Sequence, residues 1–124
     1  MEKYCVEIAG RKIPLRYTMR ELADMEEAIG TMDTFRDLIL KGTHRIRNMA
    51  AAIRVMGNAA LKKEGKKEVL TDEWLLDHMD PRQIKAYQIA VLGAFTDGFQ
   101  MENENRQERD LVLEELERKK DGGN

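Results

Sequence analysis

The first part of the chain alternates between large apolar side chains and smaller or polar ones. Two short runs share this pattern, with apolar residues at Tyr4, Val6, Ile8 and again at Ile13, Leu15, Tyr17. Such alternation predicts two half-buried β-strands, and Gly10-Arg11 between them fits the centre of a type II′ turn. The predicted hairpin spans residues 4–17 and brings all six apolar side chains to one face. Its cross-strand pairs are Ile8 with Ile13, Val6 with Leu15 and Tyr4 with Tyr17.

Pro14 lies within the second predicted strand. Proline has no N–H to donate to a neighbouring strand, so we expect this strand to lie at the edge of a sheet. Two strands are only marginally stable by themselves. Helices or another subunit must therefore cover the apolar face of the hairpin.

Helical spacing begins directly after the hairpin. Thr18 followed by Glu21 forms the pattern of a capping box, which predicts a helix that starts there. The apolar stripe of this helix consists of Leu22, Met25 and Ile29. Gly30 fits the left-handed position just after a helix end. A second, shorter helix is expected over residues 32–41.

The longest amphipathic pattern covers residues 43–63, where apolar residues recur at every third or fourth position. We expect one long helix here. Its polar side carries a candidate basic interaction face, which consists of Arg47, Arg54 and Lys62.

Two further helix starts follow. Thr71 is placed to cap a short helix. Asp80 precedes Pro81 at a first helical position, which predicts a last long helix over residues 81–101. Between residues 86 and 95 that helix is apolar on nearly every side. We therefore expect it to be central, or to be covered by a partner on one flank.

A length of 124 residues with 42% hydrophobic residues suits one domain with its own core. The predicted fold class is α+β, mostly α: an N-terminal β-hairpin (4–17) followed by about five helices (18–101) in one compact domain, residues 1–101. Residues 102–124 are expected to form a polar, flexible and partly disordered tail. One short helical segment of this tail contains the apolar residues Leu111, Leu113 and Leu116. Helices of this length are marginal in water, so we expect a partner to order it.

The sequence carries no complete catalytic, cofactor or metal motif. His44 and His78 are far apart and form no ligand pair at helical spacing. Asp77, His78 and Asp80 could hold a divalent ion, but a solvated helix end explains them equally well. Cys5 has no histidine nearby in the sequence to activate it. We therefore expect a non-enzymatic protein without a metal or cofactor.

The sequence also predicts where the protein is found. Its single cysteine cannot form an intramolecular disulfide, and no leader-like segment follows Met1. The longest uncharged stretch, residues 86–96, has 11 residues. A helix needs roughly 20 to cross a bilayer. We expect a cytoplasmic protein without a membrane span.

Charge is unevenly distributed along a chain whose net charge is −2. Residues 41–67 hold eight Lys or Arg and one Glu, whereas residues 68–101 hold six acidic and two basic residues. The basic segment suits nucleic-acid binding, but it contains no aromatic residue to stack on bases. Pairing between the two segments, within or between copies, is a simpler explanation. We expect self-association through the hairpin edge or the helix 81–101, repeated head to tail into a ring or spiral.

A distinctive series of short motifs runs along the chain. It consists of VEIAGRKIPLRYTMREL and EEAIG within residues 6–30, IRVMGNA at 53–59, LTDEWLL at 70–76 and DLVLEE at 110–115. In this order, over nearly the whole chain, the motifs resemble the small tail assembly chaperones of long-tailed bacteriophages and prophages. The resemblance implies a non-enzymatic factor that binds the tape measure protein and helps recruit tail tube subunits before the tube polymerises.

The resemblance also implies partners and a location. The protein is expected in the cytoplasm of the bacterial host and not in the mature virion. Its client-binding surface is expected to include the apolar residues Phe99, Met101, Leu111, Leu113 and Leu116. The alternative function is that of a nucleic-acid-binding regulator of a phage or mobile element, which would use the basic segment 41–67.

Many chaperones of this family are also made in a longer form, through a ribosomal frameshift near the end of the short reading frame. Lys119-Lys120 can be encoded by an A-rich run on which tRNAs slip, so we expect an overlapping downstream frame. The same lysines equally well balance the charges of Glu114, Glu115 and Glu117.

Overall fold

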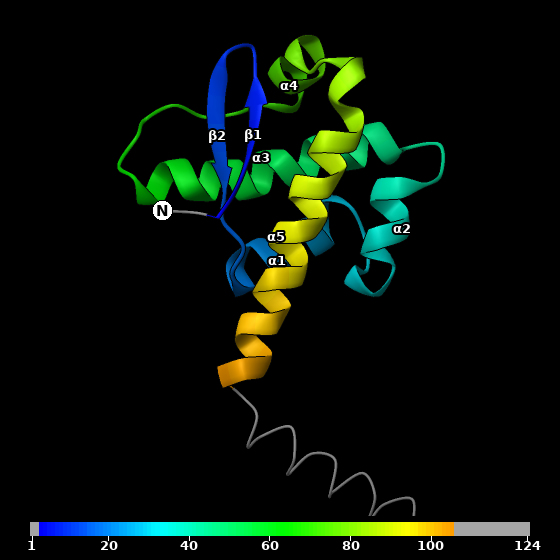
Figure 1. Cartoon of the computed structure of the whole chain (residues 1–124), viewed down its shortest axis with the longest axis vertical. Coiled ribbons are helices and arrows are strands. Elements are labelled where there is room, and N and C mark those ends of the chain that lie inside the picture. The colour runs from blue at the N-terminus through cyan, green and yellow to red at the C-terminus, as the bar shows by residue number, and fades with distance from the viewer. Residues whose placement is uncertain (1–2, 106–124) are drawn as a thin grey trace, which may run out of the picture.

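The chain begins with a β-hairpin and continues as a series of helices (Figure 1). The computed structural model describes the backbone of residues 3–105 and the side chains of residues 3–98. Strands β1 (Tyr4–Ile8) and β2 (Arg11–Leu15) pair antiparallel. They are followed by α1 (Met19–Ala28), the 3₁₀ helix η1 (Met32–Thr34), α2 (Phe35–Leu40), α3 (Arg45–Lys63), α4 (Asp72–His78), the 3₁₀ helix η2 (Pro81–Gln83) and α5 (Ile84–Asn105). The predicted fold class, an N-terminal hairpin followed by about five helices, is confirmed.

The register of the hairpin differs from the predicted one by two residues. Val6 pairs with Ile13 and Ile8 pairs with Arg11, so the predicted partners of Ile8, Val6 and Tyr4 are wrong. The turn consists of Ala9 and Gly10, whose φ angles are 52° and 77°. Two positive φ angles are what a type I′ turn requires. The sequence misled us because alanine rarely adopts a positive φ.

A shift by two residues keeps every side chain on its face, because side chains alternate with a period of two. The prediction that the large apolar side chains share one face is therefore confirmed despite the wrong register. The buried residues of the hairpin are Val6, Ile8, Ile13 and Leu15.

The predicted helix starts are confirmed by their caps. The Thr18 backbone N–H donates to Glu21 Oε1 at 2.9 Å, and the capping box is complete. The Trp74 N–H donates to the Thr71 hydroxyl at 3.1 Å, which begins α4. Asp80 Oδ1 accepts from the Arg82 N–H at 2.9 Å and begins the η2–α5 segment.

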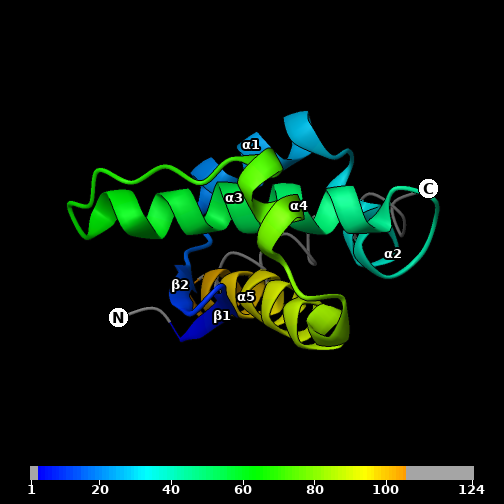
Figure 2. The same cartoon turned by 90° about the horizontal axis from the view of Figure 1, so that it is seen from above.

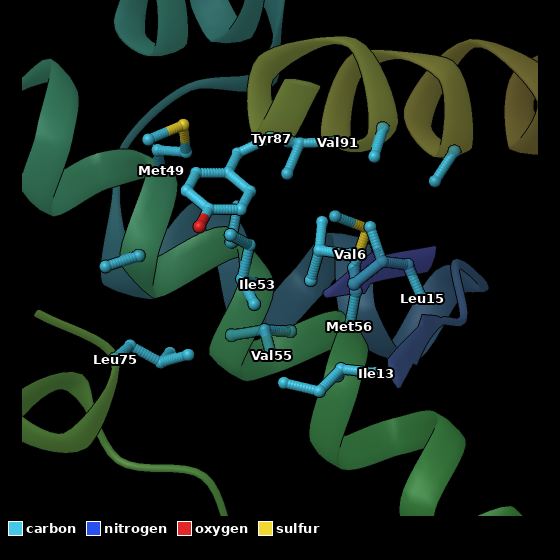
Figure 3. Close-up of a cluster of buried hydrophobic side chains, with 14 of the residues drawn as sticks. Val6, Ile13, Leu15, Met49, Ile53, Val55, Met56, Leu75, Tyr87 and Val91 are labelled. Atoms are coloured by element: carbon cyan, nitrogen blue, oxygen red, sulfur yellow. The ribbon is translucent and has the colours of Figure 1, made fainter. Parts of the chain in front are cut away.

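Helix α3 lies in the middle of the fold. Figure 2 shows α1 on one side of it and the hairpin with α5 on the other. The core forms where these layers meet, and side chains from the hairpin, α3 and α5 point into one shared cluster (Figure 3). The largest fully buried side chains are Phe35, Ile8, Ile13, Met25, Ile39, Met49, Ile53, Met56, Leu75 and Val91.

Gly57 marks the place where β2 crosses α3. A Cβ at this position would lie 2.7 Å from Leu70 Cδ1 and 2.9 Å from Ile13 Cγ2. Beside it, the Arg16 backbone N–H donates to the Met56 carbonyl oxygen at 3.0 Å. The glycine therefore lets the hairpin and the loop after α3 approach the helix closely.

Helix α5 packs across the hairpin through one face. Tyr87, Val91 and Ala94 are buried, whereas Ile89 on another face is 62% exposed. The helix continues through Asn105, four residues beyond its predicted end. Coverage of its exposed flank by a partner stays a prediction. Within residues 3–105, the helices are too short or too polar to cross a bilayer.

Candidate protein-binding groove

An open groove of ≈ 920 Å³ lies between α1 and α3. Its α1 wall carries the charged residues Arg20, Glu21, Asp24 and Glu27. Its α3 wall carries Arg54, Lys62 and Lys63. Val55 and Ala59 add small apolar surface between them, and Arg16 from the end of β2 completes the set of charges. The groove therefore presents five cationic side chains and three carboxylates.

The α1 wall is held in place by the capping box. Glu21 is 4% exposed, and its Oε1 also accepts from the Thr18 hydroxyl at 2.8 Å. One helical turn further on, Arg20 Nε lies 3.3 Å from Asp24 Oδ2. The carboxylates of Glu21 and Asp24 are thus engaged within α1 itself.

The α3 wall is anchored at its middle by contacts to later parts of the chain. Arg54 Nε donates to Asp72 Oδ1 at 2.7 Å, which ties α3 to the first turn of α4. This ion pair joins the basic segment 41–67 to the acidic segment 68–101. The predicted pairing between the two segments therefore occurs within one molecule at this point.

The far end of the α3 wall consists of two exposed lysines. Lys62 and Lys63 lie in the last turn of α3, where cations interact favourably with the helix dipole. Among the residues whose side chains are described, no carboxylate forms an ion pair with either lysine. This end of the groove carries the cationic charge that is available to a ligand.

The structure brings together only part of the predicted basic face. Arg54 and Lys62 both line the groove, whereas Arg47 is exposed on α3 outside it. Sequence reasoning missed the opposing wall. The spacing of Arg20, Asp24 and Glu27 by four and three places them on one side of α1, and this signal could have indicated a charged face.

The predicted client-binding residues are not described in atomic detail. Phe99 and Met101 belong to helix α5, but their side chains lie outside the described part of the structure. Three further residues, Leu111, Leu113 and Leu116, lie wholly outside the described residues. This assignment stays a prediction.

The segment at the end of α4 has structural roles. The ring of His78 stacks on Trp74 with centroids 4.6 Å apart, and its Nδ1 lies 2.8 Å from the Trp74 carbonyl oxygen. Asp80 accepts from the Arg82 guanidinium, and this hydrogen bond lowers the pKa of the Asp80 carboxyl. Within the described side chains, no cluster of three or more His, Cys, Asp or Glu residues could hold a metal ion.

The groove presents charges of both signs to a ligand. All three carboxylates belong to the α1 wall, and three of the five cations belong to the α3 wall. Comparison of the chain with protein-family models, with curated proteins and with solved structures gives no significant match.

Proposed function

We propose that this protein is a non-enzymatic tail assembly chaperone, which binds the tape measure protein and helps recruit tail tube subunits. The proposal is supported by the sequence motifs that resemble this family, within residues 6–30, 53–59, 70–76 and 110–115. It acts in the bacterial cytoplasm before the tail is complete and is absent from the virion.

The path of helix α5 is the structural observation that best supports this proposal. The helix begins in the core, where Tyr87 and Val91 are buried. It then runs past the packed helices to Asn105, as Figure 1 shows. The helix thus carries the chain away from the core before the apolar residues of the C-terminal segment. An extended apolar client could bind there without opening the core.

Co-expression with the tape measure protein tests the proposal. We expect the wild-type chain to raise the soluble fraction of this client. The double variant Leu113→Ser/Leu116→Ser should keep the helix content of the wild type and lose most of this effect. Val69→Ser is the matched control, because Val69 is an apolar side chain that is 74% exposed elsewhere on the surface.

Two outcomes would contradict the proposal. The first is an insoluble tape measure protein in the presence of the folded wild-type chain. The second is equal client solubility with the wild type, the leucine variant and the control, which would remove the assignment of Leu113 and Leu116.

A gel shift with nonspecific DNA separates this proposal from the nucleic-acid alternative. Arg54 is already paired with Asp72, and the basic segment 41–67 contains no aromatic residue to stack on bases. We therefore expect no shift at moderate salt. A salt-dependent shift that Arg47→Glu abolishes would favour the regulator instead.

A further inference from the structure

We infer that the groove between α1 and α3 receives the acidic C-terminal segment, residues 110–117, of a second copy of this chain. This contact goes beyond client binding, because it concerns the carboxylates of the segment and not its leucines. Its test is therefore independent of the tape measure protein.

The cationic end of the groove is the first observation that carries this inference. Arg20 and Arg54 are engaged with Asp24 and Asp72. Lys62 and Lys63 are exposed, and no carboxylate among the described side chains forms an ion pair with them. A ligand that supplies closely spaced carboxylates would complement this end of the α3 wall.

The chain itself contains a segment with this chemistry. Residues 110–117 hold four carboxylates and no cation. Three of them, Asp110, Glu114 and Glu117, are spaced by four and three, which would place them on one face of a helix. A helical segment could thus present a row of negative charge to the lysines and leave its leucines on other faces.

The direction of α5 favours a second copy over the same chain. A Cβ at Gly98 would meet the ring of Tyr17, whose neighbours Arg16 and Thr18 line the groove. Beyond this contact α5 continues to Asn105 and away from the packed helices (Figure 1). The C-terminal segment would have to reverse this direction to enter its own groove, whereas the groove of a neighbouring molecule requires no reversal.

A contact of this kind is heterologous, because the segment of one copy meets the groove of the next. A pair of copies then keeps one free groove, on one copy, and one free segment, on the other. Repetition gives a ring if the rotation closes and an open filament if it does not.

Charge reversal with rescue tests the inference by sedimentation equilibrium of the full chain. We expect Lys62→Glu/Lys63→Glu to raise the dissociation constant of self-association about ten-fold or more. Glu114→Lys/Glu117→Lys should have the same effect. A chain with all four substitutions should return to within about three-fold of the wild type, because the opposite charges face each other again.

The control variant has the same change in net charge, but its two substitutions lie outside the groove. Arg36 and Arg45 are exposed and lie outside the groove, the hairpin and α5, so Arg36→Glu/Arg45→Glu should leave self-association within about two-fold of the wild type. Circular dichroism checks that each variant is folded. If the loss of the two lysines unfolds the last turn of α3, the C-terminal variant decides alone.

Several results would overturn the inference. The first is a wild-type chain that is monomeric at high micromolar concentration. The second is self-association of the charge-reversed variants that equals that of the wild type. The others are a chain with all four substitutions that does not regain self-association, and a control variant that weakens self-association as much as the charge reversals do. A monomer whose NMR signals in α1 and α3 shift on Glu114→Lys/Glu117→Lys would place the segment in its own groove, which also overturns it.

Discussion

The side chain of Asn58 pairs with both backbone groups of Leu70. Its Nδ2 donates to the Leu70 carbonyl oxygen at 3.0 Å, and its Oδ1 accepts from the Leu70 N–H at 2.7 Å. The Asn58 amide thereby makes the two hydrogen bonds that a neighbouring strand would otherwise make with the backbone of Leu70. It holds the loop that follows α3 against the helix, where Leu70 is buried next to Gly57.

Removal of this amide should destabilise the protein measurably. In Asn58→Ala the part-buried N–H and C=O of Leu70 lose their partners, so we expect a loss of about 1–3 kcal/mol in the free energy of unfolding. Asn48→Ala is the matched control in the same helix, because Asn48 makes one hydrogen bond, to the Leu38 carbonyl oxygen. Urea unfolding followed by circular dichroism measures both. Equal losses in the two variants would contradict the special role of Asn58.

Short-range features of the fold were visible in the sequence because their partners are close along the chain. Thr18 and Glu21 are three residues apart, and both the box and the helix start were predicted correctly. The predicted hairpin register was wrong because of one residue. It depends on a positive φ at Ala9, which the surrounding structure imposes and the residue type does not favour.

Long-range features could not be predicted in the same way. The groove joins α1 and α3, and its two walls become neighbours only through the packing of the whole core. Sequence reasoning identified Arg54 and Lys62 and proposed pairing between the basic and acidic segments, but it did not identify Asp72 as the partner of Arg54. The sequence places Gly57 inside a helical pattern, but only the structure shows that Ile13 packs closely against it.

The capping box offers a second prediction. Glu21 is buried, and one of its oxygens accepts from both the N–H and the hydroxyl of Thr18. Glu21→Ala should cost about 1–2 kcal/mol of unfolding free energy, as loss of a cap and of a buried acceptor. Glu21→Gln keeps an acceptor oxygen and should lose less. A glutamine variant as unstable as the alanine variant would show that the carboxylate charge matters, and not the cap.

Gly93 provides a third prediction, in which the sign is diagnostic. Alanine at an exposed helix position stabilises by about 1 kcal/mol relative to glycine. At Gly93, however, a Cβ would lie 2.5 Å from Cε1 and 2.9 Å from Cζ of Tyr4. Because the ring must move, we expect Gly93→Ala to destabilise the protein by about 1–3 kcal/mol.

A double-mutant cycle isolates this contact. In a Tyr4→Ala background the space is empty, so Gly93→Ala should become neutral or stabilising. The same unfolding experiment measures all four chains. A penalty of equal size in both backgrounds would exclude the ring of Tyr4 as its cause.

The last prediction concerns the ion pair that joins the start of β1 to α5. Lys3 Nζ lies 3.0 Å from Asp97 Oδ2. The hydrogen bond from Lys3, supported by one from Tyr4, lowers the pKa of Asp97 below 3.8, and the bond to Asp97 raises the pKa of Lys3 above 10.5. A carboxyl group whose pKa is lowered by folding stabilises the fold at pH values above its pKa in the unfolded chain, and this stabilisation is lost as the pH falls. A lysine whose pKa is raised by folding stabilises the fold at pH values below its pKa in the unfolded chain, and this stabilisation is lost as the pH rises.

The stabilisation by the Lys3–Asp97 pair should therefore be complete only at pH values between the pKa of Asp97 and the pKa of Lys3 in the unfolded chain. We expect Asp97→Asn to lower Tm at neutral pH, and only slightly, since Lys3 is largely exposed. In acid, below the pKa of Asp97 in both the folded and the unfolded chain, the variant should have the same Tm as the wild type. Asp77→Asn is the control, because Asp77 is exposed and forms no ion pair among the described side chains. Thermal unfolding across the acidic range gives the comparison. A difference between Asp97→Asn and the wild type that persisted unchanged into strong acid would assign the effect to packing of the side chain rather than to its charge.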